Sequence, residues 1–243
     1  MSTIAENIAK VGERIREAAQ ASGRDFASIG LFAVSKTKPS TAVREAFAAG
    51  IRDFGENYLQ EALEKQVELN DLPLIWHFIG PIQSNKTKPI AEHFAWVHSV
   101  DRLKIAQRLS EQRPAHLPPL QVCLQLNVDG GANKAGVPPE EARALALAVA
   151  PLPRLQLRGV MSIPEPAADF ATQRALHLRA QAVWADIAAL AQEGSTPQAV
   201  KAGLAQWDTL SLGMTADLEA AIAAGSTLVR VGSGIFGARA ARA

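Results

Sequence analysis

Residues 29–36 read Ile-Gly-Leu-Phe-Ala-Val-Ser-Lys, an almost continuous apolar run that ends in a serine and a lysine. Similar runs return at residues 122–128 and 227–231. A strand that is apolar at nearly every position is expected where a sheet is covered on both faces, as in a parallel sheet flanked by helices. The run therefore indicates a parallel sheet, for which the rest of the chain must supply covering helices.

On both sides of this run, short apolar segments alternate with longer helical patterns. We predict strands at residues 29–35, 52–55, 74–79, 96–100, 120–128, 155–163, 209–212 and 227–231. We predict helices at residues 39–49, 58–68, 84–93, 102–113, 138–150, 168–193 and 216–224, after an N-terminal amphipathic helix within residues 1–23. Eight strand–helix units predict an α/β fold, namely a (β/α)8 TIM barrel with an extra N-terminal helix. We expect this barrel to form one domain over residues 1–243. An open doubly wound sheet is the alternative.

Composition limits the classes of partner. A formal net charge of +1 gives no large field that could hold nucleic acid or an anionic membrane. The N-terminal segment lacks the pattern of a signal peptide, and the apolar helical stretches are too short to cross a bilayer. Cys123, the only cysteine, lies in an apolar run and is expected to be a small core residue. We expect a cytoplasmic protein that binds neither nucleic acid nor membranes.

Lys36 is the first candidate for chemistry. In a (β/α)8 barrel the active face lies at the carboxyl ends of the strands, and Val34-Ser35-Lys36 ends the first predicted strand. A lysine that enters the barrel mouth from an apolar strand loses hydration, which lowers its pKa and makes its amine available for Schiff-base chemistry. The alternative is a surface lysine at a strand end, an interpretation that fits Lys38.

Two glycine-containing loops follow the seventh and eighth predicted strands. They read Leu212-Gly213-Met214-Thr215 and Gly232-Ser233-Gly234. The first supplies a hydroxyl and the N–H groups of a helix start, and the second supplies backbone amides with little side-chain bulk, so together they could hold a phosphate. Ordinary turn glycines with a threonine N-cap are the alternative.

The other polar candidates are less specific. Arg230 lies two residues before the second glycine loop and could face a phosphate or an ion-pair partner. His77, His93 and His98 lack the spacing of metal ligands, and no Asp/Glu cluster joins them, so no metal site is predicted.

Motifs along nearly the whole chain resemble those of one protein family. They are Phe32-Ala33-Val34-Ser35-Lys36, Phe54-Gly55-Glu56-Asn57-Tyr58, Trp76-His77-Phe78-Ile79-Gly80, Gln83-Ser84-Asn85-Lys86, Asn127-Val128-Asp129, Arg158-Gly159-Val160-Met161, Leu210-Ser211-Leu212-Gly213-Met214 and the segment 230–237, Arg-Val-Gly-Ser-Gly-Ile-Phe-Gly. In this order they resemble the YggS/PROSC family of pyridoxal 5′-phosphate (PLP) homeostasis proteins.

The resemblance implies a barrel similar to the N-terminal domain of alanine racemase, with PLP held on Lys36 as the internal aldimine. It implies that Arg230 faces the pyridine nitrogen, which keeps that nitrogen unprotonated because a guanidinium can only donate. The remaining cofactor-binding residues that it implies are Asn57, His77, Met161 and Ser162 along the cofactor and Ser211, Gly213, Met214, Thr215, Gly232 and Ser233 around the phosphate. Thr215 and Ser233 replace a serine and a threonine common in the family, so the hydroxyls are retained.

The family implies a cofactor carrier or buffer, with no residue assigned a catalytic role. Its implied partners are PLP and PLP-dependent apoenzymes, and its expected state is a monomer. The alternative is a weak amino-acid racemase, whose usual second base is a tyrosine from a separate domain. The only tyrosine here, Tyr58, is expected to begin a helix. A Schiff-base aldolase or a phosphate-binding barrel enzyme without PLP forms a third class.

Overall fold

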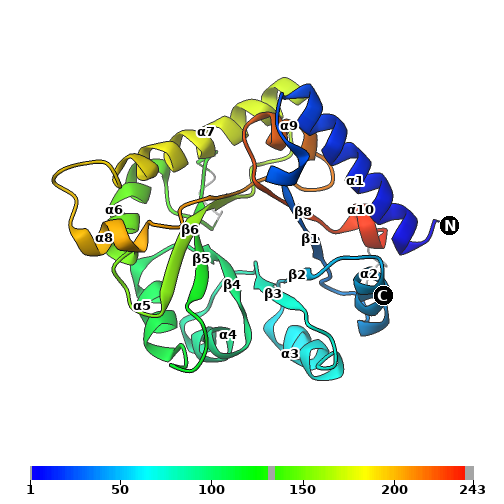
Figure 1. Ribbon diagram of the computed structural model, residues 1–243, viewed down its shortest axis with the longest axis horizontal. Coiled ribbons are helices and arrows are strands. Elements are labelled where there is room, and N and C mark those ends of the chain that lie inside the picture. Colours follow the sequence, from blue (N-terminus) through cyan, green and yellow to red (C-terminus); the bar gives the residue numbers. More distant parts are fainter. Residues whose placement is uncertain (1, 131–134, 239–243) are drawn as a thin grey trace.

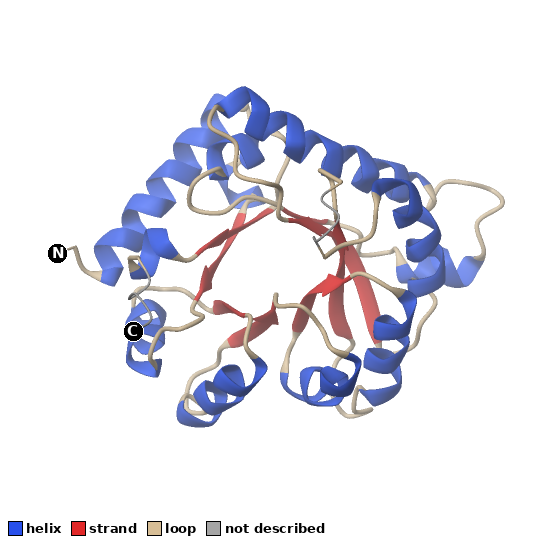
Figure 2. Cartoon of the chain, turned by 180° about the vertical axis from the view of Figure 1, so that it is seen from behind, coloured by secondary structure: helices blue, strands red, loops and turns tan. Residues whose placement is uncertain are grey.

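Eight parallel strands form a closed barrel in the order of the chain, with helices around the outside (Figures 1 and 2). The computed structural model describes residues 2–130 and 135–238. The strands are β1 (Gly30–Val34), β2 (Asp53–Glu56), β3 (Ile75–Phe78), β4 (Trp96–Val100), β5 (Leu120–Leu126), β6 (Leu155–Ser162), β7 (Thr209–Ser211) and β8 (Leu228–Val231).

The helices that alternate with these strands form the outer layer. They are α1 (Ile4–Ala21), α2 (Ser40–Ala48), α3 (Leu59–Glu68), α4 (Thr87–His93), α5 (Leu103–Gln112), α6 (Pro139–Val149), α7 (Phe170–Ala189), α8 (Gln198–Gly203), α9 (Leu218–Ala223) and α10 (Ser233–Phe236), with 3-10 helices η1 (Phe26–Ser28) and η2 (Ser84–Lys86). Among the described residues, no helix has the length and apolarity needed to span a bilayer.

Pairing of the first strand with the last closes the sheet. β1 pairs in parallel with β8 from Gly30 opposite Leu228 to Ala33 opposite Val231, and it pairs with β2 on its other edge. This closure confirms the predicted (β/α)8 barrel and rules out the open doubly wound sheet.

The extra N-terminal helix is also confirmed. Thr3 and Glu6 form a capping box at the start of α1, and its apolar face buries Val11 and Ile15. α1 packs against α9 and α10, the two helices that follow β7 and β8 (Figure 1). α1 therefore supports the two helices that follow the loops after β7 and β8.

Two short helices differ from the sequence predictions. α8 occupies part of the segment between α7 and β7 for which no element was predicted, and α10 begins at Ser233, within the predicted glycine loop. Both are shorter than two turns and contain glycine, so they lack the apolar periodicity and the capping residues by which helices are recognised in sequence. Their form is set by packing.

Aromatic and histidine side chains fill part of the barrel interior. Phe32 of β1 stacks on His77 of β3 with 4.7 Å between ring centroids. His77 Nδ1 lies 2.9 Å from His98 Nε2, and His77 Nε2 lies 2.9 Å from Asp53 Oδ1. Gly55 makes room for these rings, because a Cβ there would lie 2.5 Å from the ring of Phe32.

Candidate functional site

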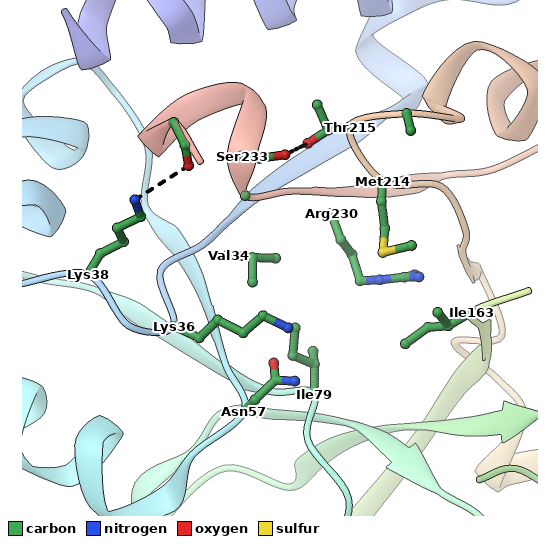
Figure 3. Close-up of a pocket in the computed structure, with 13 residues that line it drawn as sticks. Val34, Lys36, Lys38, Asn57, Ile79, Ile163, Met214, Thr215, Arg230 and Ser233 are labelled. Carbon is green, nitrogen blue, oxygen red and sulfur yellow. Dashed lines mark hydrogen bonds between the residues drawn. The ribbon is translucent and has the colours of Figure 1, made fainter. Parts of the chain in front are cut away.

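A cavity of about 300 Å³ opens at the carboxyl ends of the strands (Figure 3). Its wall comes from residues at the ends of, or just after, β1, β2, β3, β6, β7 and β8. Small-molecule sites have volumes from about 300 Å³ upward. The position is the one at which (β/α)8 barrels bind their ligands.

Lys36 extends into this cavity from the segment that follows β1 (Figure 3). The Ser35 amide N donates to the Gly55 carbonyl oxygen at 3.0 Å, so pairing with β2 continues to the residue before Lys36. Thr37, the residue after it, has a φ of 64°, which turns the chain away from the strand direction. Lys36 therefore lies at the bend between strand and loop.

The loops after β7 and β8 meet across the cavity from this bend. Thr215 Oγ1 accepts hydrogen bonds from the Gly234 amide at 3.1 Å and from Ser233 Oγ at 3.2 Å. Gly213 has a φ of 86°, and a Cβ there would lie 2.5 Å from the side chain of Ala221, so the turn requires glycine. The hydroxyls and amides of both loops are thus gathered in one place, where they could hold a phosphate.

Asp217 holds the first of these loops in shape. Its Oδ1 accepts from the Met214 amide at 2.7 Å, and its Oδ2 lies 2.9 Å from Nε2 of the buried His177. Burial favours the neutral acid, but the hydrogen bonds from His177 and from the Met214 amide outweigh it and keep the pKa of Asp217 below its ordinary value. The carboxylate is therefore charged at neutral pH and fixes the Met214 backbone.

Arg230 of β8 lines the cavity and connects β8 to β6 and β7. Its Nη1 donates to the Ser211 carbonyl oxygen at 2.5 Å and to Ser211 Oγ at 3.0 Å, and its Nη2 donates to the Ser162 carbonyl oxygen at 2.8 Å. Desolvation lowers the pKa of Arg230 to about 10. The guanidinium is therefore a fixed cation at neutral pH and can act only as a donor.

The side-chain oxygen of Asn57, Oδ1, is a buried hydrogen-bond acceptor without a donor. Asn57 lines the cavity beside Ile79. Buried polar atoms of this kind are uncommon and call for an explanation, such as a ligand.

The predicted site residues fall into two groups. Seven line the cavity: Lys36, Asn57, Met214, Thr215, Arg230, Gly232 and Ser233. Five do not belong to the described lining: His77, Met161, Ser162, Ser211 and Gly213. Of the second group, Ser162, Ser211 and Gly213 bond Arg230 through their carbonyl groups, whereas Met161 and His77 are buried in β6 and β3.

Lys38 is the main residue that the sequence interpretation misjudged. It lines the cavity, and its Nζ donates to the Phe236 carbonyl oxygen at 2.9 Å and to the Gly237 carbonyl oxygen at 3.4 Å, so it is not a free surface lysine. These acceptors are the carbonyls at the end of α10, which the sequence did not predict. Ile79 and Ile163 were also missed, although each is the last residue of a predicted strand and could have been found by position.

In this barrel, a lysine after β1 faces two glycine-containing loops after β7 and β8. This arrangement defines a class of protein, which comparison with known proteins identifies. The model of the alanine racemase N-terminal domain family matches residues 3–240. A Pseudomonas aeruginosa protein called pyridoxal phosphate homeostasis protein is 66% identical over 239 residues, covering 98% of this chain and 97% of the relative. An Escherichia coli protein of the same name is 48% identical over 242 residues, covering 98% of each chain.

A solved structure agrees with these relatives. PipY from Synechococcus elongatus, in its PLP-bound structure, has a TM-score of 0.79 and 37% sequence identity, covering 97% of this chain and all of that chain. The present chain therefore belongs to the YggS/PROSC family of pyridoxal phosphate homeostasis proteins, as its sequence motifs predict.

The residues around the cavity fit PLP chemically. The cavity combines a lysine, a group of hydroxyl and amide donors suited to a phosphate, a buried cation and the unpartnered Oδ1 of Asn57. An aldehyde, a phosphate and a polar aromatic ring are the groups of PLP that these features would meet.

Proposed function

We propose that this protein binds PLP through a Schiff base on Lys36 and serves as an intracellular carrier or buffer of the cofactor. The observation that carries the proposal is the position of Lys36, which enters the cavity opposite the loops after β7 and β8 (Figure 3). The PLP bound to PipY and the name shared by the relatives support it. The proposed setting is a single-domain monomer in the cytoplasm, with PLP-dependent apoenzymes as recipients.

Different residues would contact different groups of PLP. Lys36 supplies the nucleophilic amine, Thr215, Ser233 and the amides around Gly232 hold the phosphate, and Arg230 faces the ring nitrogen. Bound PLP supplies an aldehyde that condenses with amines and a ring that can withdraw electrons. Because Arg230 can only donate, it would keep the ring nitrogen unprotonated and weaken this withdrawal.

The described lining also favours a carrier over a racemase. Racemisation needs a second proton-transfer group on the face opposite the lysine. Tyr58 stands just before α3, is exposed and is not part of the described lining. Lys38 is the other amine there, and its ammonium is bonded to the carbonyls of α10.

Borohydride reduction followed by peptide mass mapping tests the cofactor and its anchor. Purified protein is incubated with PLP, reduced and digested, and we expect a phosphopyridoxyl adduct on Lys36. Lys36→Ala should lose both the visible absorbance and the adduct, whereas Lys38→Ala, the matched control in the same cavity, should keep the adduct on Lys36. Wild-type protein that stays colourless and unlabelled would overturn the proposal.

Two activity measurements separate the carrier from the racemase. The loaded protein should restore activity to a PLP-dependent apoenzyme, and L-alanine incubated with it should stay L-alanine by chiral chromatography. Sustained formation of D-alanine that disappears in Lys36→Ala would instead establish the racemase.

A further inference from the structure

A buried ion cluster lies against the segment that carries Lys36. Lys65 of α3 is only 5% exposed. Its Nζ donates to the Ser35 carbonyl oxygen at 2.7 Å, and also to Glu56 Oε1 at 2.7 Å and Glu61 Oε1 at 2.6 Å. An ammonium has three N–H donors, so these three bonds use all of them. The Lys65 amine is therefore fully engaged and does not compete with Lys36 for an aldehyde.

The same cluster also holds the residue on the other side of Lys36. The Thr37 amide N donates to Glu61 Oε1 at 2.6 Å. With a φ of 64°, Thr37 adopts left-handed backbone that residues with a side chain rarely occupy unless their surroundings enforce it. The peptide groups before and after Lys36 are thus bonded to one pair of side chains on α3.

We propose that Glu61 and Lys65 are positioning residues for the reaction of Lys36 with PLP. By fixing the Ser35 carbonyl and the Thr37 amide, they hold the bend from which the Lys36 side chain enters the cavity. This inference rests on the proposed function.

The geometry indicates an indirect role. Neither Glu61 nor Lys65 belongs to the described cavity lining, and both lie on α3, outside the barrel. Their effect on PLP must therefore pass through the backbone of Lys36. Small displacements of a reacting group slow a reaction strongly, so the effect should fall on the rate of covalent attachment.

The test compares Glu61→Ala with Glu61→Gln. Glutamine keeps an oxygen that can accept from the Thr37 amide, so it controls for the loss of the negative charge. Alanine removes the acceptor itself. Lys65→Met is unsuitable as the main variant, because it would leave the buried carboxylate of Glu56 without its cation and compromise folding.

Two measurements are made on each variant. Stopped-flow absorbance gives the rate at which PLP becomes attached, and calorimetry with pyridoxine 5′-phosphate, which lacks the aldehyde, gives the affinity of the cavity. We expect Glu61→Ala to slow attachment at least about tenfold, with the affinity for pyridoxine 5′-phosphate nearly unchanged. Glu61→Gln should remain within about threefold of the wild-type attachment rate.

The outcomes distinguish this inference from the proposed function. Attachment by Glu61→Ala at the wild-type rate overturns the positioning role, and so does a parallel loss of affinity for pyridoxine 5′-phosphate, which marks a general structural defect. Wild-type protein that forms no adduct on Lys36 instead contradicts the proposed function.

Discussion

Cys123 shows how the barrel controls the reactivity of a single side chain. It lies in β5 with no exposed surface, and burial raises the pKa of its thiol. Because the thiolate is the reactive form, the native protein should not react with Ellman's reagent. The same protein in guanidinium chloride should release one equivalent of the chromophore, since the chain has one cysteine. Rapid labelling of the native protein would show that β5 opens.

Sequence predicted those site residues that follow a strand directly. Lys36 and Thr215 were predicted because the carboxyl ends of parallel strands meet at one face of a barrel, whereas Asn57 was implied only by the family resemblance; all three line the cavity. Glu61 and Lys65 were not found, because a charged residue inside an amphipathic helix is usually solvated. Only the folded chain shows that Lys65 turns inward.

At the scale of elements, the contact between β6 and β7 depends on a glycine. A Cβ on Gly159 of β6 would lie 1.6 Å from the Thr209 carbonyl oxygen of β7, and this contact is with backbone that cannot rotate away. We expect Gly159→Ala to lower the free energy of unfolding by about 3 kcal/mol or more, as overpacking of a core does. Urea unfolding followed by circular dichroism measures the change.

A second glycine provides the matched control for that substitution. A Cβ on Gly12, within α1, would meet nothing within 4 Å. Because alanine is the better helix former, Gly12→Ala should raise the free energy of unfolding by up to about 1 kcal/mol. Equal free energies of unfolding for Gly159→Ala and Gly12→Ala would contradict the close approach of β6 to β7.

Elements differ in how far their sequence determines them. β1, β5 and β8 carry apolar runs that require cover on both faces, so their existence and a parallel sheet follow from sequence. The closed barrel is distinguished from an open sheet only by the pairing of β1 with β8. α10 has four residues, and its carbonyls are bonded by Lys38 and by Asn7 of α1. Its form depends on residues far away in the chain, which no local pattern reveals.

For the whole molecule, the histidines inside the barrel make stability depend on pH. Burial lowers the pKa of His77, against the opposing effect of Asp53. Burial also lowers the pKa of His98 strongly, helped by the nearby His77 and by the positive charge of Arg230. Both rings are therefore neutral in the folded protein at pH values where the unfolded chain, with histidine pKa values near 6.5, binds protons. The folded protein must lose stability as the pH falls below about 6.5.

The size of this loss can be tested with one substitution. Between about pH 7.5 and 5.5, a histidine that stays neutral in the folded protein removes roughly 1.4 kcal/mol from the free energy of unfolding. His98→Gln should therefore lose less stability over this range than the wild type, by about that amount, in urea titrations at the two pH values. His93→Gln is the control for the substitution itself, because His93 is exposed and lies outside the barrel interior. Equal pH dependence in His98→Gln and the wild type would mean that His98 takes up a proton without unfolding, and that the barrel interior admits charge.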